Sequence, residues 1–228
     1  GKTIGLVGES GSGKTTLGRA ILRLVKFTSG EVLIDGRNIA DIGSKEFLSF
    51  RKKMQIIFQD PYASLNPRLT IEQTLTEPME VHEIESNQSD RTNLAVSLLE
   101  EVGLESAHLK RYPHEFSGGQ RQRICVARAL TTQPEFIVCD ECVSAMDVSV
   151  QAQVLNLLQE LKESRNLTYL FISHDLCVVR HISDDIVVMR SGRIEEHGNA
   201  EEICQQPKSP YTQELLDSIP QTRRSNNI

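Results

Sequence analysis

Short apolar runs alternate with amphipathic segments in the first 60 residues and again after residue 135. The apolar runs predict buried strands at residues 3–7, 54–58, 136–139, 168–172 and 186–189. Apolar positions at helical spacing predict helices at residues 15–25, 44–53, 150–161, 176–181 and 210–219. A further short strand and turn are expected at residues 31–36. Strands that alternate with helices predict an α/β fold with a mostly parallel sheet.

The segment between residues 61 and 135 has a different pattern, with few strand signals. Helical spacing there predicts helices at residues 70–82, 90–102 and 117–130. Pro78 is expected to break or bend the first of them, because proline removes a backbone donor. We therefore expect one domain, residues 1–228, made of an α/β core (1–60 and 136–206), a helical insertion (61–135) and a C-terminal helix and tail (207–228).

Composition narrows the classes of function. The net charge is −6 and no long run of Lys and Arg occurs, which disfavours a nucleic-acid partner. No apolar stretch approaches the roughly 20 residues that span a bilayer, and no signal-peptide pattern is present, so any membrane role is expected to come through partner subunits. The five cysteines are scattered, which indicates reduced thiols and a cytosolic location.

Cys139 and Cys142 form a C-x-x-C pair, for which zinc or redox chemistry is one interpretation. No second cysteine pair follows it in the sequence. We favour the alternative, in which Cys139 is a small buried strand residue and Cys142 a loop residue.

Residues 8–15 join a predicted strand to a predicted helix and carry glycines, a lysine and a threonine. The run is Gly8, Glu9, Ser10, Gly11, Ser12, Gly13, Lys14 and Thr15. This pattern is typical of a P-loop, whose backbone N–H groups and helix start face phosphate oxygens. Lys14 is expected to reach the β- and γ-phosphates, and Thr15 to place its hydroxyl on Mg²⁺. A plain glycine-rich turn is the alternative, which the Lys-Thr pair disfavours.

Two further patterns suit phosphate chemistry. Asp140 and Glu141 end an apolar strand, where Asp140 could hold Mg²⁺ and Glu141 could polarise an attacking water. Such carboxylates also begin ordinary loops, so the P-loop upstream is what favours the catalytic interpretation. The second pattern is a helix start with bare glycines, Ser117, Gly118, Gly119 and Gln120, which could bind a phosphate or could simply cap a helix.

Taken together, these motifs resemble those of the nucleotide-binding subunits of ABC transporters. The matching elements occur in the family's order and are the Walker A run 8–15, the Q-loop Gln59, the signature 116–120, the Walker B strand 136–140 with Glu141, the D-loop 144–147 and the switch histidine His174. The resemblance implies a P-loop NTPase (RecA-like) core with a mostly parallel sheet, plus a helical ABC-specific subdomain. It also implies ATP hydrolysis, with ATP and Mg²⁺ as ligands.

The resemblance also implies roles for individual residues. Lys14 and the backbone N–H groups of residues 11–16, including Thr16, would hold the phosphates. Mg²⁺ would be organised by Thr15, Gln59 and Asp140. Catalysis would involve Glu141 as general base together with Lys14, Gln59 and His174. Ser117, Gly118, Gly119 and Gln120 would bind ATP held by an opposite subunit, and Asp147 would link the two sites.

Three segments, residues 58–68, 148–155 and 209–216, are similar to those of oligopeptide and dipeptide importers, a likeness that nickel, glutathione and peptide-antibiotic systems share. This implies a second ATPase subunit or domain, identical or different, two transmembrane permease subunits and, indirectly, an extracytoplasmic solute-binding protein. The chain would be peripheral, at the cytoplasmic face of the bacterial inner membrane, with a groove along residues 59–80 for the permeases. A soluble mechanical ATPase of DNA repair or translation is the alternative, which the lack of heptads and basic insertions disfavours.

The sequence departs from the family pattern in two ways. Cys142 stands where the family usually has proline, so the loop after Glu141 could differ in rigidity. The sequence also begins at the P-loop strand, so the family's N-terminal antiparallel strands and the aromatic residue that stacks on adenine are largely missing from it. We therefore expect a slice of a longer protein, with weaker ATP binding and poorer stability than the extended domain.

Overall fold

A six-stranded sheet forms the centre of the protein, in a computed structural model that describes residues 1–218. The strands are β1 (Thr3–Val7), β4 (Met54–Ile57), β5 (Phe136–Asp140), β6 (Thr168–Ile172), β7 (Asp185–Arg190) and β8 (Arg193–Asn199). Their order is β4-β5-β6-β1-β7-β8, and all neighbours are parallel except β7 and β8. A separate hairpin joins β2 (Leu33–Ile34) to β3 (Arg37–Asn38). The mostly parallel sheet is as predicted.

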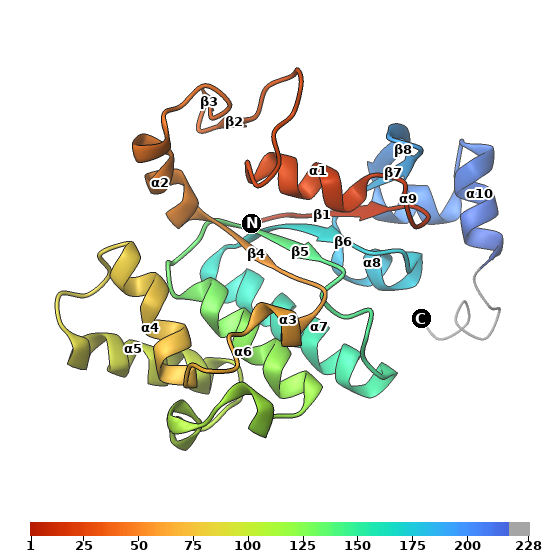
Figure 1. Ribbon diagram of the computed structural model, residues 1–228. Helices are drawn as coiled ribbons and strands as arrows, with labels where there is room; N and C mark the ends of the chain where they lie inside the picture. The colour runs from red at the N-terminus through yellow and green to blue at the C-terminus, as the bar shows by residue number, and fades with distance from the viewer. Residues whose placement is uncertain (219–228) are drawn as a thin grey trace.

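Helices cover both faces of this sheet (Figure 1). They are α1 (Lys14–Ile21), α2 (Ser44–Lys53), α3 (Pro61–Ser64), α4 (Ile71–Val81), α5 (Gln88–Glu101), α6 (Gly118–Leu130), α7 (Val148–Arg165), α8 (Leu176–Ile182), α9 (Ala200–Gln205) and α10 (Pro210–Asp217), with 3-10 turns η1 (Ser106–Lys110) and η2 (Pro113–Glu115). Helices α1 and α2 lie on one side of the sheet, and α6, α7 and α8 on the other (Figure 1). No helix of residues 1–218 is both long and apolar enough to cross a bilayer.

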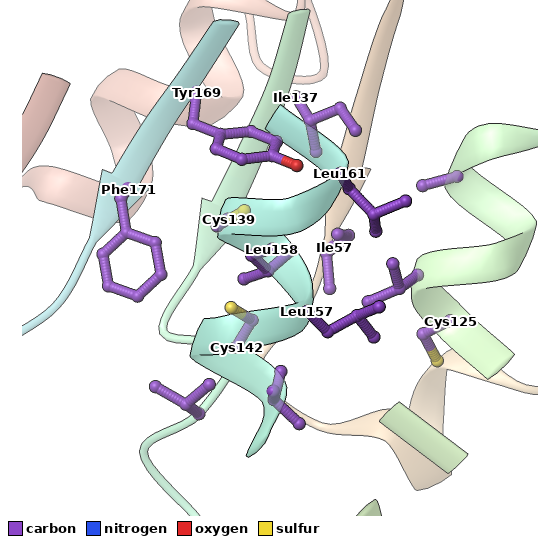
Figure 2. Close-up of a cluster of buried hydrophobic side chains, with 14 of the residues drawn as sticks. Ile57, Cys125, Ile137, Cys139, Cys142, Leu157, Leu158, Leu161, Tyr169 and Phe171 are labelled. Atoms are coloured by element: carbon purple, nitrogen blue, oxygen red, sulfur yellow. The ribbon is translucent and has the colours of Figure 1, made fainter. Parts of the chain in front are cut away.

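Strands β5 and β6 are almost completely buried on both faces, which suits their mostly apolar residues. Leu170 and Ile172 of β6 belong to the apolar cluster on the α2 side, whereas Tyr169 and Phe171 belong to the cluster on the α6 and α7 side. Figure 2 shows the second cluster, in which apolar side chains of α7 lie against those of β5 and β6. Alternate strand residues therefore fill opposite layers, as the period of two in a strand requires.

Both cysteines of the C-x-x-C pattern, Cys139 and Cys142, lie in this second cluster (Figure 2). Cys139 and Cys142 are 0% and 1% exposed, and both are free thiols. A hydrogen bond with Cys142 and burial raise the pKa of Cys139 well above its usual value. A buried, protonated thiol is a poor nucleophile and a poor metal ligand, so the two cysteines act as core residues.

Helix α4 is not broken at Pro78, because it continues through this residue to Val81. Ile71, Leu75 and Met79, before and after the proline, are completely buried. Packing on both sides of Pro78 therefore holds the helix together, although the missing proline N–H removes one backbone hydrogen bond from it.

Other elements differ in length or were not predicted. Helix α1 ends at Ile21 rather than near residue 25. Arg23 has a φ of 51°, which is incompatible with a right-handed helix, so the helix cannot extend through it. Strand β2 is shorter than expected. Strand β8 was missed because most of its side chains are exposed and carry no apolar pattern. Helix α10 ends at Asp217, and the predicted end of this helix and the tail, residues 219–228, lie outside the described residues.

Candidate nucleotide-binding site

The P-loop, residues 8–13, connects the carboxyl end of β1 to the start of α1. At Gly8 the loop passes so close to β7 that a Cβ atom would lie 2.1 Å from the carbonyl oxygen of Met189. Only glycine fits there without a backbone shift. Gly13 is the N-cap of α1 and provides no side-chain cap, so the helix start can receive an anion.

Lys14 lies inside this loop, with only 4% of the residue exposed. Its Nζ atom donates hydrogen bonds to the carbonyl oxygens of Gly8 at 2.8 Å and Glu9 at 2.9 Å. Burial lowers the pKa of Lys14, and the carboxylates of Glu141 and Asp140 act in the opposite direction. The loop therefore holds the Lys14 ammonium group, which is hydrogen-bonded to two backbone carbonyls and remains able to bind a phosphate.

Thr15 and Asp140 meet beside the P-loop. The hydroxyl of Thr15 donates to Oδ1 of Asp140 at 2.7 Å, and the guanidinium of Arg19 lies 3.8 Å from Oδ2. Both residues line a cavity of about 500 Å³, together with Arg19, Phe58, Gln59, Asp60, Ala63, Ser64 and Arg128. Oxygen donors at the edge of a polar cavity suit a hard cation such as Mg²⁺.

Three segments bring polar side chains to Glu141. Its Oε2 atom accepts a hydrogen bond from Nε2 of Gln59 at 3.1 Å and lies 3.6 Å from Nδ1 of His174. The same Gln59 nitrogen lies 3.3 Å from Oγ of Ser144. The Glu141 amide donates to the carbonyl oxygen of Ile172 at 3.0 Å, which fixes the loop against β6. A carboxylate, a side-chain amide and a histidine therefore converge at one edge of the sheet.

This convergence follows from the topology. In a parallel sheet the carboxyl ends of the strands lie at one edge, and ligands bind outside that edge. The P-loop follows β1, Glu141 follows β5, His174 follows β6 and Gln59 follows β4. The structure thus brings together the predicted residues Lys14, Thr15, Gln59, Asp140, Glu141 and His174.

The signature residues lie elsewhere, at the start of α6 on the other side of the sheet from α1 (Figure 1). Oγ of Ser117 accepts from the Gln120 amide at 3.3 Å, and Oε1 of Gln120 accepts from the Ser117 amide at 3.0 Å. Gly119 packs against Val150 of α7, and the carboxylate of Asp147 accepts from the Val150 amide at 2.9 Å. These predicted site residues are thus gathered at a second surface, where they also cap two helices.

Three residues near the site were missed by the sequence analysis. Arg19 lies one helical turn after Thr15, so helical spacing could have placed it on the same face. Ser144 belongs to the D-loop motif, but its contact with Gln59 depends on the fold. Tyr211 lies far along the chain, and nothing in its local pattern indicates that its hydroxyl accepts the Glu9 amide.

Comparison with known proteins identifies this arrangement. Residues 1–144 match the family described as ABC transporter. The chain belongs to the ABC transporter family. It is 54% identical over 221 residues to the oligopeptide transport ATP-binding protein OppF of Bacillus subtilis, covering 96% of this chain and 72% of the relative. It is 53% identical over 221 residues to OppF of Streptococcus mutans, covering 97% and 72%.

Solved structures agree with the ABC ATPase fold. The dimeric, post-hydrolysis structure of the ATP-binding cassette MJ0796, bound to ADP and phosphate, superposes with a TM-score of 0.78 at 30% identity. That match covers 87% of this chain and 85% of the other. The predicted family and fold class are confirmed, and this ABC transporter subunit is a nucleotide-binding ATPase.

Proposed function

We propose that this chain is the ATP-hydrolysing, energy-coupling subunit of an ABC importer for oligopeptides, dipeptides or similar small solutes. The observation that carries the proposal is the 54% identity over 96% of the chain to a protein named for oligopeptide transport. Relatives with such names do not favour the alternative, a soluble ABC ATPase of DNA repair or translation.

Within the site, the chain's own residues divide the work. The P-loop run Gly8, Glu9, Ser10, Gly11, Ser12, Gly13, Lys14, Thr15 and Thr16 binds the phosphates. Glu141 accepts a proton from the attacking water, as a general base must lie within hydrogen-bond reach of the proton it removes. His174, 3.6 Å from the Glu141 carboxylate, orients that water and the γ-phosphate. Gln59, through its contact with Glu141, couples changes at the nucleotide site to the helical insertion.

Mg²⁺ fits beside the P-loop. The Thr15 hydroxyl and the Asp140 carboxylate lie 2.7 Å apart and would supply two ligands. Mg²⁺ needs few protein ligands, because phosphate oxygens and waters fill its other coordination positions. No cluster of three or more His, Cys, Asp or Glu side chains that could cage a metal occurs in residues 1–218. Gln59 lines the same cavity and completes the proposed set. When bound, the ion would neutralise charge on the β- and γ-phosphate oxygens.

A second subunit would complete each ATP site. We assign Ser117, Gly118, Gly119 and Gln120 to the γ-phosphate of ATP held by the opposite chain, and Asp147 to the link between the two sites. The exposure of Ser117 and Gly118 supports this assignment, because a ligand can reach them from outside the chain. MJ0796, the structural neighbour, is itself dimeric. Loss of the γ-phosphate would then open the pair of subunits.

The helical insertion, residues 61–135 between the two parts of the core, would face the permeases. Tyr62 is 64% exposed and its ring lies 3.5 Å from the guanidinium carbon of Arg121 near the start of α6. Arg128 of the same helix donates to the carbonyl oxygen of Ser64. A permease segment that moves α3, within the proposed groove 59–80, would therefore move α6. The relatives named for oligopeptide transport support a peripheral location on the cytoplasmic face of the inner membrane, with a solute-binding protein acting on the far side.

Co-purification and transport test this function together. A tagged chain would be extracted in detergent from the membranes of its own cells, and the complex would be reconstituted into vesicles with labelled oligopeptides. We expect permease subunits to co-purify and ATP to drive peptide accumulation with the wild type but not with Glu141→Gln. Purification without membrane proteins, combined with ATPase activity that nucleic acid stimulates, would overturn the proposal in favour of the soluble ATPase.

A further inference from the structure

Helix α10 is attached directly to the P-loop. Tyr211, in its first turn, is 3% exposed, and its hydroxyl oxygen accepts a hydrogen bond from the Glu9 amide at 3.2 Å. The guanidinium carbon of Arg190, at the end of β7, lies 4.6 Å from the centroid of the Tyr211 ring. The residues around Tyr211 are one of the importer-like segments of the sequence, and the proposed catalytic roles do not use them.

The start of α10 is itself firmly held. The carboxylate of Glu196, on β8, accepts hydrogen bonds from the amides of Lys208 at 2.8 Å and Ser209 at 3.0 Å. Burial alone would raise the pKa of Glu196, but these and other hydrogen-bond donors lower it. Pro210 occupies the first helical position, where its fixed φ favours the helix. The Tyr211 hydroxyl therefore contacts the P-loop from a helix start that is fixed by hydrogen bonds to Glu196.

The hydrogen bond acts on the peptide unit that also holds the catalytic lysine. The Glu9 N–H and the Gly8 carbonyl belong to one planar amide, and in a trans amide they point in opposite directions. The N–H side is fixed by Tyr211, and the carbonyl side accepts from Nζ of Lys14 at 2.8 Å. A rotation of this peptide plane would break both hydrogen bonds at once. The hydroxyl of Tyr211 thus sets the orientation of a carbonyl that positions Lys14.

We propose that Tyr211 is a positioning residue for nucleotide binding, whose hydroxyl keeps the Gly8–Glu9 peptide in the orientation that directs its carbonyl toward Lys14. Helix α10 then preorganises the P-loop, and displacement of α10 lowers the affinity for nucleotide. This inference rests on the nucleotide-binding site alone and does not depend on which solute is transported.

The substitution Tyr211→Phe tests the proposal, because it removes the hydroxyl and keeps the buried ring beneath Arg190. We expect the dissociation constant for ATP and the KM of hydrolysis to rise about threefold to tenfold, the range of one hydrogen bond. The kcat at saturating ATP should stay within about twofold, since nothing near Glu141 changes. Hydrogen exchange of the Glu9 amide, measured without nucleotide, should become faster.

Tyr169→Phe is the matched control. Tyr169 is also a buried tyrosine, but it lies at the amino end of β6, and its hydroxyl has no hydrogen-bond partner among residues 1–218. This variant should leave KM unchanged. Equal KM and equal Glu9 exchange in Tyr211→Phe and wild type would overturn the inference, as would a loss confined to kcat or to thermal stability. If the wild type itself bound no ATP, the proposed site would fail, which is a different result from failure of Tyr211 alone.

Discussion

Two glycine-rich helix starts, those of α1 and α6, suit a phosphate in different ways. The start of α1 has no side-chain cap and surrounds the buried cation of Lys14. The start of α6 is closed by the reciprocal cap between Ser117 and Gln120, and the nearby Arg121 is directed at the backbone carbonyl of Pro113. An anion at α1 meets open amides and a charge, whereas at α6 the cap already uses the backbone amides of Ser117 and Gln120. This difference supports our proposal that the first surface binds nucleotide within one chain and the second engages a nucleotide held by another.

Removal of the base should have the largest effect and should separate chemistry from binding. Glu141→Gln keeps the side chain's shape and its contact with Gln59 but cannot accept a proton. We expect kcat for ATP hydrolysis to fall about 10²- to 10⁴-fold, with little change in the dissociation constant for ATP. Steady-state hydrolysis and equilibrium binding measure the two quantities. ATP-dependent dimerisation, followed by light scattering, should become stable in this variant; retention of wild-type hydrolysis would remove Glu141 from its role.

Lys14→Ala, set beside Ser117→Ala, tests whether the two helix starts differ in their contribution to ATP binding by a single chain. We expect the dissociation constant for ATP of the single chain to rise about 10- to 100-fold, because a charged hydrogen-bond donor is lost. Ser117→Ala should leave that constant unchanged but prevent ATP-dependent association, and it should destabilise the fold by about 1 kcal/mol through loss of the N-cap. Calorimetric titration of both variants checks this. An equal loss of affinity in both would mean that α6 contributes to binding within one chain.

Gly118 and Gly119 of the signature differ in how closely they pack, so substitutions at the two test the environment of the α6 start. A Cβ at Gly119 would lie 2.5 Å from Cγ1 of Val150, whereas a Cβ at Gly118 would meet no atom of the described residues within 4 Å. Gly119→Ala should therefore lower the free energy of unfolding by about 1–3 kcal/mol, and Gly118→Ala by much less. Denaturant unfolding measures both. If the two variants were equally stable, the close packing of α6 on α7 would be wrong.

The smallest expected effect concerns the strand that carries the P-loop. Oδ2 of Asp184 accepts from the amide of Thr3 and from Nζ of Lys162, both at 2.7 Å. Burial raises the pKa of Asp184, but the hydrogen bonds of Lys162 and Thr3 outweigh it, so the pKa is lowered. A carboxyl whose folded pKa is lowered stabilises the fold above its unfolded pKa of about 3.9 and loses that contribution as the pH falls through the folded value.

Asp184→Asn should therefore reduce stability at neutral pH and flatten the acid limb of the stability curve. The carboxylate is 44% exposed, so solvent limits the contribution to under about 1 kcal/mol. Thermal unfolding across the acid range checks the slope. Nucleotide affinity at neutral pH should not change, because Asp184 lies at the amino end of β1, away from the P-loop. A large loss of affinity would show that the two ends of β1 are coupled.

Much of the fold was predictable because the local pattern and the tertiary packing agree. The core strands were found from apolar runs that are buried on both faces. Strand β8 was not, because Ile194 and most of its neighbours are exposed. The expected break at Pro78 does not occur, since burial of Leu75 and Met79 outweighs the local preference of proline.

Local sequence alone specifies which chemistry each segment offers: a glycine loop with Lys14, a carboxylate pair after a strand, and a self-capped helix start at Ser117. Tertiary structure alone decided which of them meet. Gln59 and Glu141 are 82 residues apart along the chain, and Glu9 and Tyr211 are 202 apart, yet each pair is hydrogen-bonded. The parallel sheet gathers strand ends at one edge whatever their separation, and no local pattern of residues encodes contacts of that range.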